Sequence, residues 1–131
     1  MVKKKFTQRV ALILSLSLLV CFGIAEAAGK YSFSYKFKHQ LDVDDTFKAT
    51  KSTADFSIYT TTNNSTSNTF TIKQYEYGFF SDSFVTSKGI GCKKDSTGTA
   101  SFDTKSGTKY TYDFWKVEDD KYVVGSGTLS Y

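Results

Sequence analysis

Aromatic and polar residues alternate along much of the chain after residue 30. Between Tyr31 and Lys38 every odd position is aromatic and every even position is polar. Because successive side chains of a strand point to opposite faces, this pattern predicts a strand with one apolar face and one wet face. The same alternation predicts strands at 46–51 and 55–61. The inward candidates in these two strands are Phe47, Ala49, Phe56 and Ile58.

The middle of the chain predicts a less regular arrangement. A strand is expected from Thr69 to Tyr77, and its apolar positions change parity between Ile72 and Tyr75, which indicates a bulge or a twisted edge. A short strand is expected to include residues 84 and 85. The segment 87–98, which contains glycines, is predicted as the longest loop.

The last third predicts a hairpin made of strands 99–104 and 108–117, joined by a three-residue loop that ends in glycine. Trp115 lies off the parity of its neighbours, so the second strand is expected to be central and covered on both sides. After a turn at 118–120, residues 122–124 return, and the glycines in 125–127 are expected to break the run before a final strand.

These patterns predict an all-β fold of about seven or eight short antiparallel strands, arranged as a β-sandwich or a small barrel. Composition agrees, because aromatic and β-branched residues fit a pleated sheet, whereas Ala, Glu and Gln are scarce after residue 27.

The first 27 residues resemble a secretory leader. Cations at positions 3–5 and 9 precede an uncharged, largely apolar run at 10–25 and the sequence Ala25-Glu26-Ala27. We expect cleavage between Ala27 and Ala28, which leaves residues 28–131 as one secreted, extracellular domain. The apolar run has 16 residues, fewer than the roughly 20 that span a bilayer, so no stable membrane span is expected in the mature form. An uncleaved anchor is the alternative.

The leader also carries most of the net charge. It holds four of the 17 cations and one of the 13 acidic residues, so the remainder carries 13 lysines against 12 acidic groups and no arginine. Bidentate recognition of phosphate or guanine depends on the arginine guanidinium. Nucleic acid is therefore not an expected partner.

Cys92 is the single cysteine after the leader, so an internal disulfide is excluded. We expect a free thiol at a strand end or in a loop, with an intermolecular disulfide as the alternative. Lys93 and Lys94 lie beside it, where positive charge could lower its pKa.

Few residues offer catalytic chemistry. His39 is the single histidine and is expected to be a solvated residue at a strand end; a Cys92–His39 nucleophile pair is the alternative. The acidic stretch Asp42–Asp45 is predicted as a loop that could bind calcium weakly, as could the turn 118–120, although aspartate is also a common turn residue. We expect no enzyme activity, no cofactor and no metal.

The aromatic surplus is the feature most suggestive of binding. Twenty of the 35 apolar residues after residue 27 are Phe, Tyr or Trp. They can stand in for leucine and isoleucine in the core, or they can contact sugars and proteins from the surface. The surface candidates are Tyr59, Tyr75, Tyr77 and Trp115.

The segment Lys109-Tyr110-Thr111-Tyr112-Asp113-Phe114-Trp115, the lysine-rich leader and the proline-free chain rich in Tyr, Ser, Thr and Asn resemble short exported β-sandwich proteins of Gram-positive bacteria, including the lactococcin-type bacteriocins. That resemblance implies an antibacterial role at the envelope and transfers no catalytic residue. This chain is longer, and Trp115 is not at its end.

The expected function is a secreted, non-enzymatic binding module whose partner is a cell-wall glycan, the envelope or another protein. A bacteriocin-like antibacterial protein is one alternative. A self-assembling matrix component is another, since aromatic edge strands without proline favour self-association.

Overall fold

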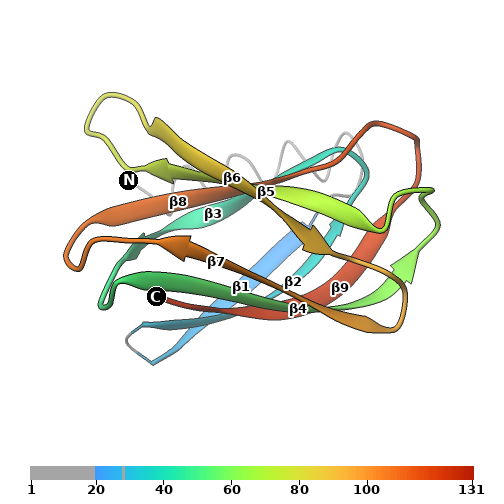
Figure 1. Cartoon of the computed structure of the whole chain (residues 1–131), viewed down its shortest axis with the longest axis horizontal. Coiled ribbons are helices and arrows are strands. Elements are labelled where there is room, and N and C mark those ends of the chain that lie inside the picture. The colour runs from blue at the N-terminus through green and yellow to red at the C-terminus, as the bar shows by residue number, and fades with distance from the viewer. Residues whose placement is uncertain (1–19, 28) are drawn as a thin grey trace.

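Two antiparallel sheets pack face to face as an open sandwich (Figure 1). The computed structural model describes residues 20–27 and 29–131, and in that part of the chain it contains nine strands. They are β1 (Val20–Ala27), β2 (Lys30–Phe37), β3 (Gln40–Lys48), β4 (Thr53–Asn63), β5 (Thr69–Glu76), β6 (Ser83–Gly91), β7 (Ser96–Asp103), β8 (Lys109–Trp115) and β9 (Val123–Ser130). Sheet A has the order β1-β2-β9-β4-β7, and sheet B has the order β3-β8-β5-β6. The expectation of an antiparallel all-β fold is confirmed, as a sandwich and not a closed barrel.

The core fills the space between the sheets with aromatic rings. In β2 the odd positions of 31–37 are buried and the even positions are more exposed, as the alternation predicts. The ring of Phe114 on β8 lies 5.0 Å from that of Phe70 and 5.7 Å from that of Phe33, centroid to centroid. Tilted and edge-to-face contacts of this kind are favourable beyond simple burial. Of the 20 aromatic residues after residue 27, 11 are buried in this core, so just over half of the aromatic surplus serves packing.

Glycines in β9 make room for these rings. A Cβ on Gly125 would lie 2.4 Å from the hydroxyl of Tyr35, and one on Gly127 would lie 3.0 Å from Cζ of Phe33. The predicted break at 125–127 is wrong, because β9 runs through both glycines as a continuous central strand.

Two predicted loops are strands. The acidic stretch Asp42–Asp45 belongs to β3, where the pairing with β8 shifts register between Val43 and Phe47. The segment 87–98 holds the end of β6 and the start of β7, joined by a short turn. In both places the strand carries polar residues or glycine at solvent-facing positions. A segment of that composition resembles a loop in the sequence.

The change of parity at residues 72–75 has another cause. Gln74 takes the inward position after Ile72 and is fully buried, so β5 keeps its alternation. Its Nε2 donates to the Tyr112 hydroxyl at 3.2 Å. The register between β5 and β6 does shift beside Gln74, where Thr86 and then Phe84 are the successive partners across the strands. The expected irregularity is present, and the extra residue is on β6.

The hairpin predicted at 99–117 is a crossover. β7 lies in sheet A and β8 in sheet B, so the loop with Gly107, whose φ is 89°, carries the chain from one sheet to the other. β8 is central, as expected. On the outer side of β8, Trp115 is half-buried, and among the described residues no third layer covers this side. The expectation that β8 is covered on both sides is therefore wrong.

Most of the predicted leader lies outside the described residues. Its last eight residues form β1, which pairs with β2 at the edge of sheet A, and Ala28 at the predicted cleavage position is outside the described residues. Among the residues that the structure describes, no helix is long and apolar enough to cross a membrane.

Candidate functional site

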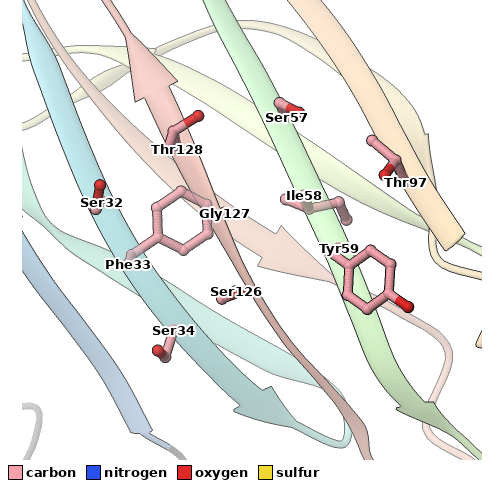
Figure 2. Close-up of a pocket in the computed structure, with 10 residues that line it drawn as sticks. All are labelled: Ser32, Phe33, Ser34, Ser57, Ile58, Tyr59, Thr97, Ser126, Gly127 and Thr128. Atoms are coloured by element: carbon pink, nitrogen blue, oxygen red, sulfur yellow. The ribbon is translucent and has the colours of Figure 1, made fainter. Parts of the chain in front are cut away.

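Small hydroxyl side chains cover the outer face of sheet A. Strands β2, β9, β4 and β7 lie side by side there, and two rows of outward residues cross them, with one residue from each strand in each row. The first row is Ser32, Thr128, Ser57 and Thr99, and the second is Ser34, Ser126, Tyr59 and Thr97. We call these eight residues the hydroxyl face; all but Thr99 appear in Figure 2.

An open pocket of about 610 Å³ lies on this face. Its rim is made by residues of the hydroxyl face from all four strands, as Figure 2 shows. Phe33, Gly127 and Ile58 lie between the two rows and are directly paired across β2, β9 and β4. The side chains of Phe33 and Ile58 are buried beneath the sheet, and a side chain at Gly127 would meet them there, so no side chain of this middle row rises between the two hydroxyl rows.

The chemistry of the pocket is that of neutral hydrogen bonding. Each serine or threonine hydroxyl can donate one hydrogen bond and accept two, and the residues that line the pocket carry no charge. Tyr59 adds a ring that is 45% exposed at one side. Such a surface suits a neutral ligand with many hydroxyls and at least one apolar face.

Charges lie in the next row toward one end of sheet A. Asp55 accepts hydrogen bonds from Ser101 Oγ at 2.5 Å and Lys51 Nζ at 2.9 Å. The Ser101 hydrogen bond and then the Lys51 ammonium hold the pKa of Asp55 below its usual range. Asp55 is therefore ionised and lies at the border of the hydroxyl face. Its lowered pKa does not suit a general acid.

The structure separates the four predicted contact residues. Tyr59 lies on sheet A, in the hydroxyl face. Tyr75 and Trp115 lie on sheet B, on β5 and β8, and Tyr77 follows β5. Tyr75 contacts Phe84 with ring centroids 5.7 Å apart, and Trp115 contacts His39 at 5.5 Å. They do not form one site.

His39 has a structural role at the turn between β2 and β3. Its Nδ1 donates to the carbonyl oxygen of Lys116 at 2.6 Å, and its ring packs edge-on against Trp115. The half-buried ring is also less solvated than the sequence suggests.

Cys92 is a free, buried thiol. Its residue is 1% exposed, and burial raises the thiol pKa to about 11, against a smaller lowering by the charge of Lys116. Lys93 and Lys94, which could have lowered the thiol pKa, are exposed while the sulfur is inside, and burial dominates. Burial also leaves no accessible sulfur for an intermolecular disulfide in this fold.

Among the side chains that the structure describes, which do not include that of Asp44, no group of three or more His, Cys, Asp or Glu is placed to hold a metal ion. In the turn 118–120, Asp119 instead binds Lys116 Nζ at 2.5 Å and the Ser65 hydroxyl. The Lys116 hydrogen bond is the main cause that lowers the pKa of Asp119 to about 2.

Sequence reasoning missed the hydroxyl face and the buried Lys116. The face has a visible signal, because its serines and threonines are the polar partners in the alternating strands. No sequence signal indicates that Lys116 is buried, because a lysine before the acidic turn 118–120 is expected to be exposed.

No protein-family model matches this chain, and no curated protein sequence matches it significantly. The fold defines the class: a two-sheet antiparallel β-sandwich with a hydroxyl-rich pocket on one outer face.

Proposed function

We propose that this protein is a secreted, non-enzymatic binding module that acts at the cell surface or outside the cell, and that the hydroxyl face of sheet A holds a neutral glycan of the cell wall. The observation that carries the proposal is the pair of hydroxyl rows across four strands, with an open pocket between them and Tyr59 at its side.

The spacing of a sheet suits an extended polymer. Outward side chains repeat about every 7 Å along a strand and about every 4.8 Å across strands, so the two rows offer a regular set of donors and acceptors. A glycan presents hydroxyls on its edges and C–H groups on its ring faces. The hydroxyl rows can bind the edges, and the exposed ring of Tyr59 can pack against a sugar face.

Neutral lining favours a sugar over a charged partner. A phosphate or an acidic peptide would leave its charge unpaired against Ser and Thr hydroxyls, whereas a neutral glycan exchanges water hydrogen bonds for protein ones. The pocket lining has no histidine, lysine or carboxylate that could activate its hydroxyls as nucleophiles, which supports binding without reaction.

The test is sedimentation of the purified protein with whole cells and with isolated wall material, with growth of the cells scored in parallel. Ser126→Arg places a long cation over the centre of the face, and Ser87→Arg is the matched control on exposed β6. We expect wild type and Ser87→Arg to sediment with walls without killing, and Ser126→Arg to stay in solution. Equal sedimentation of Ser126→Arg and wild type would exclude the hydroxyl face as the site. Growth inhibition by wild type would favour a bacteriocin-like role instead.

A further inference from the structure

A pair of exposed phenylalanines forms the tip of the loop between β5 and β6. Phe79 is 81% exposed and Phe80 is 96% exposed, and their rings contact each other edge-to-face with centroids 4.9 Å apart. Single exposed apolar residues are common on protein surfaces. The loop between β5 and β6 projects from one end of the sandwich (Figure 1), and its two adjacent, nearly bare phenylalanines form an apolar patch that indicates a partner.

The loop is held in place by bonds to the sheet. Tyr77 N donates to the carbonyl oxygen of Lys109 at 2.9 Å, and Gly78 N donates to Asp82 Oδ1 at 3.3 Å. The other oxygen of Asp82 accepts a hydrogen bond from Thr111 Oγ1 at 3.0 Å. The tip is thus tied to β8 on both sides. A held tip has less freedom to lose when it binds, so the exposed rings are ready for contact.

Only glycine fits at the base of this turn, because a Cβ on Gly78 would lie 2.0 Å from the carbonyl oxygen of Ser81. The tight turn places the two phenylalanines beyond the end of the hairpin. A convex apolar tip can insert into a lipid bilayer or into a concave apolar pocket of a partner protein. The pocket on sheet A is lined mainly by hydroxyls and does not match the tip in another copy of this chain.

Behind the apolar tip lie a further exposed phenylalanine and two tyrosines, the residue types found at the interface of a membrane with water. Phe84, which is 60% exposed, lies with Tyr75 on the same hairpin, one step back from the tip, and Tyr77 lies at the base of the loop. Tyrosine is enriched at the level of lipid headgroups because its ring is apolar and its hydroxyl is polar.

Three exposed lysines lie at this end of the sandwich, as does the exposed Asp103 at the end of β7. Lys48 and Lys109 are both exposed and lie directly opposite each other on β3 and β8, and Lys105 is exposed in the neighbouring loop between β7 and β8. Like charges opposite each other cost stability unless something offsets them. Glu76 and Asp82 are the acidic groups of the hairpin, and both oxygens of Asp82 accept the hydrogen bonds just described.

From the tip, the tyrosines and the lysines together, we propose that the Phe79–Phe80 tip inserts into the headgroup region of a phospholipid bilayer, with Lys48, Lys105 and Lys109 facing anionic headgroups. This surface is separate from the hydroxyl face, so the proposal does not rest on the glycan. It gives the protein a second contact, with membrane in addition to wall.

The test is co-sedimentation with vesicles of phosphatidylcholine alone and of phosphatidylcholine with phosphatidylglycerol. The protein is used as cells produce it, with its N-terminus determined by mass spectrometry, and every variant shares that N-terminus. Phe79→Ser and Phe80→Ser remove the tip, and Val117→Ser is the matched control, because Val117 is 65% exposed and follows the opposite end of β8. Urea midpoints of all variants establish that they fold alike.

We expect wild type and Val117→Ser to bind alike, more tightly to the anionic vesicles, and each tip variant to bind about tenfold more weakly, as loss of one buried aromatic side chain implies. In a Phe80→Trp, Trp115→Phe protein, the single indole emission after residue 27 should shift to the blue on vesicle binding.

Equal vesicle binding by wild type and by a variant that combines Phe79→Ser with Phe80→Ser would overturn the proposal, as would a failure to bind either vesicle. Self-association that is lost in the tip variants, without vesicle binding, would assign the tip to a second copy and also overturn it. Wall binding by the tip variants is measured in parallel, so failure here is distinguishable from failure of the glycan site.

Discussion

The ammonium nitrogen of Lys116 lies 2.5 Å from Oδ1 of Asp119, and the lysine is only 3% exposed. The same nitrogen donates to the backbone carbonyls of Lys38 at 2.8 Å, Val117 at 3.1 Å and Lys121 at 3.2 Å. One buried cation therefore joins the turn between β2 and β3 to the segment between β8 and β9.

Acid should weaken this junction. Because the pKa of Asp119 is lowered to about 2 from 3.8, its ionised form stabilises the fold above about pH 4, and this contribution is lost as the pH falls toward 2. We expect the urea midpoint of wild type to fall between pH 4 and pH 2 by more than that of Asp119→Asn. Asp103→Asn, which removes another carboxylate, controls for net charge. Parallel curves for wild type and Asp119→Asn would contradict the assignment.

Removing the lysine should cost more. Lys116→Ala leaves the buried carbonyls without their donor, and we expect a loss of about 2 kcal/mol or more in the free energy of unfolding at pH 7. The measurement is urea unfolding. An exposed lysine such as Lys93 changed to Ala is the control and should have little effect.

Gly98 should tolerate no side chain. A Cβ there would lie 2.0 Å from the carbonyl oxygen of Gly91, where the backbone of β6 lies against β7 and closes one side of the sandwich. We expect Gly98→Ala to lower the free energy of unfolding by about 1–3 kcal/mol, as for an overpacked core. Gly89→Ala on β6 is the matched control, since nothing lies within 4 Å of its Cβ position. Similar urea midpoints for the two variants would show that the strands separate easily.

Cys92 should be unreactive while the protein is folded. Burial raises the thiol pKa from 9.0 to about 11, which lowers the thiolate fraction at neutral pH about a hundredfold, and the buried sulfur is shielded as well. We expect alkylation at pH 7.5 to be slow in buffer and fast in urea, read by mass spectrometry. Fast labelling of the folded protein would contradict the buried position.

The leader can be tested by mass. If cleavage follows Ala27, secreted protein begins at Ala28, and β2 loses β1 as its neighbour at the edge of sheet A. Lys30 and Lys36 would then lie on the exposed edge strand, where lysine discourages pairing with other chains. A secreted mass that includes residues 1–27 would disprove cleavage there.

Alternation in the sequence predicted which side chains face the core, because a strand buried on one face has a period of two. It did not predict partners. Gly107 indicated a reversal of the chain, and that signal is the same whether the next strand joins the same sheet or the other one. Gly125 and Gly127 read as a break because the rings that fill their space, those of Tyr35 and Phe33, come from a strand about 90 residues earlier.

The candidate site was predictable in part for the same reason. Tyr59 was identified from its parity, but Ser34, Ser126 and Thr97 become its neighbours only through the strand order β2-β9-β4-β7. Tyr75 and Trp115 shared the parity signal of Tyr59 and lie on the other sheet. Local pattern cannot distinguish the outer faces of two sheets.

The most direct test of the account is the binding of purified wall glycan by wild type, Tyr59→Ala and Tyr75→Ala, measured as sedimentation against glycan concentration. The two variants each remove one outward tyrosine, from sheet A and from sheet B respectively. Loss of an aromatic contact residue that matters for binding weakens it by about 1 kcal/mol or more, so we expect Tyr59→Ala to bind roughly fivefold or more weakly and Tyr75→Ala to match wild type. Unchanged binding by Tyr59→Ala, or a loss confined to Tyr75→Ala, would contradict a glycan site on the hydroxyl face.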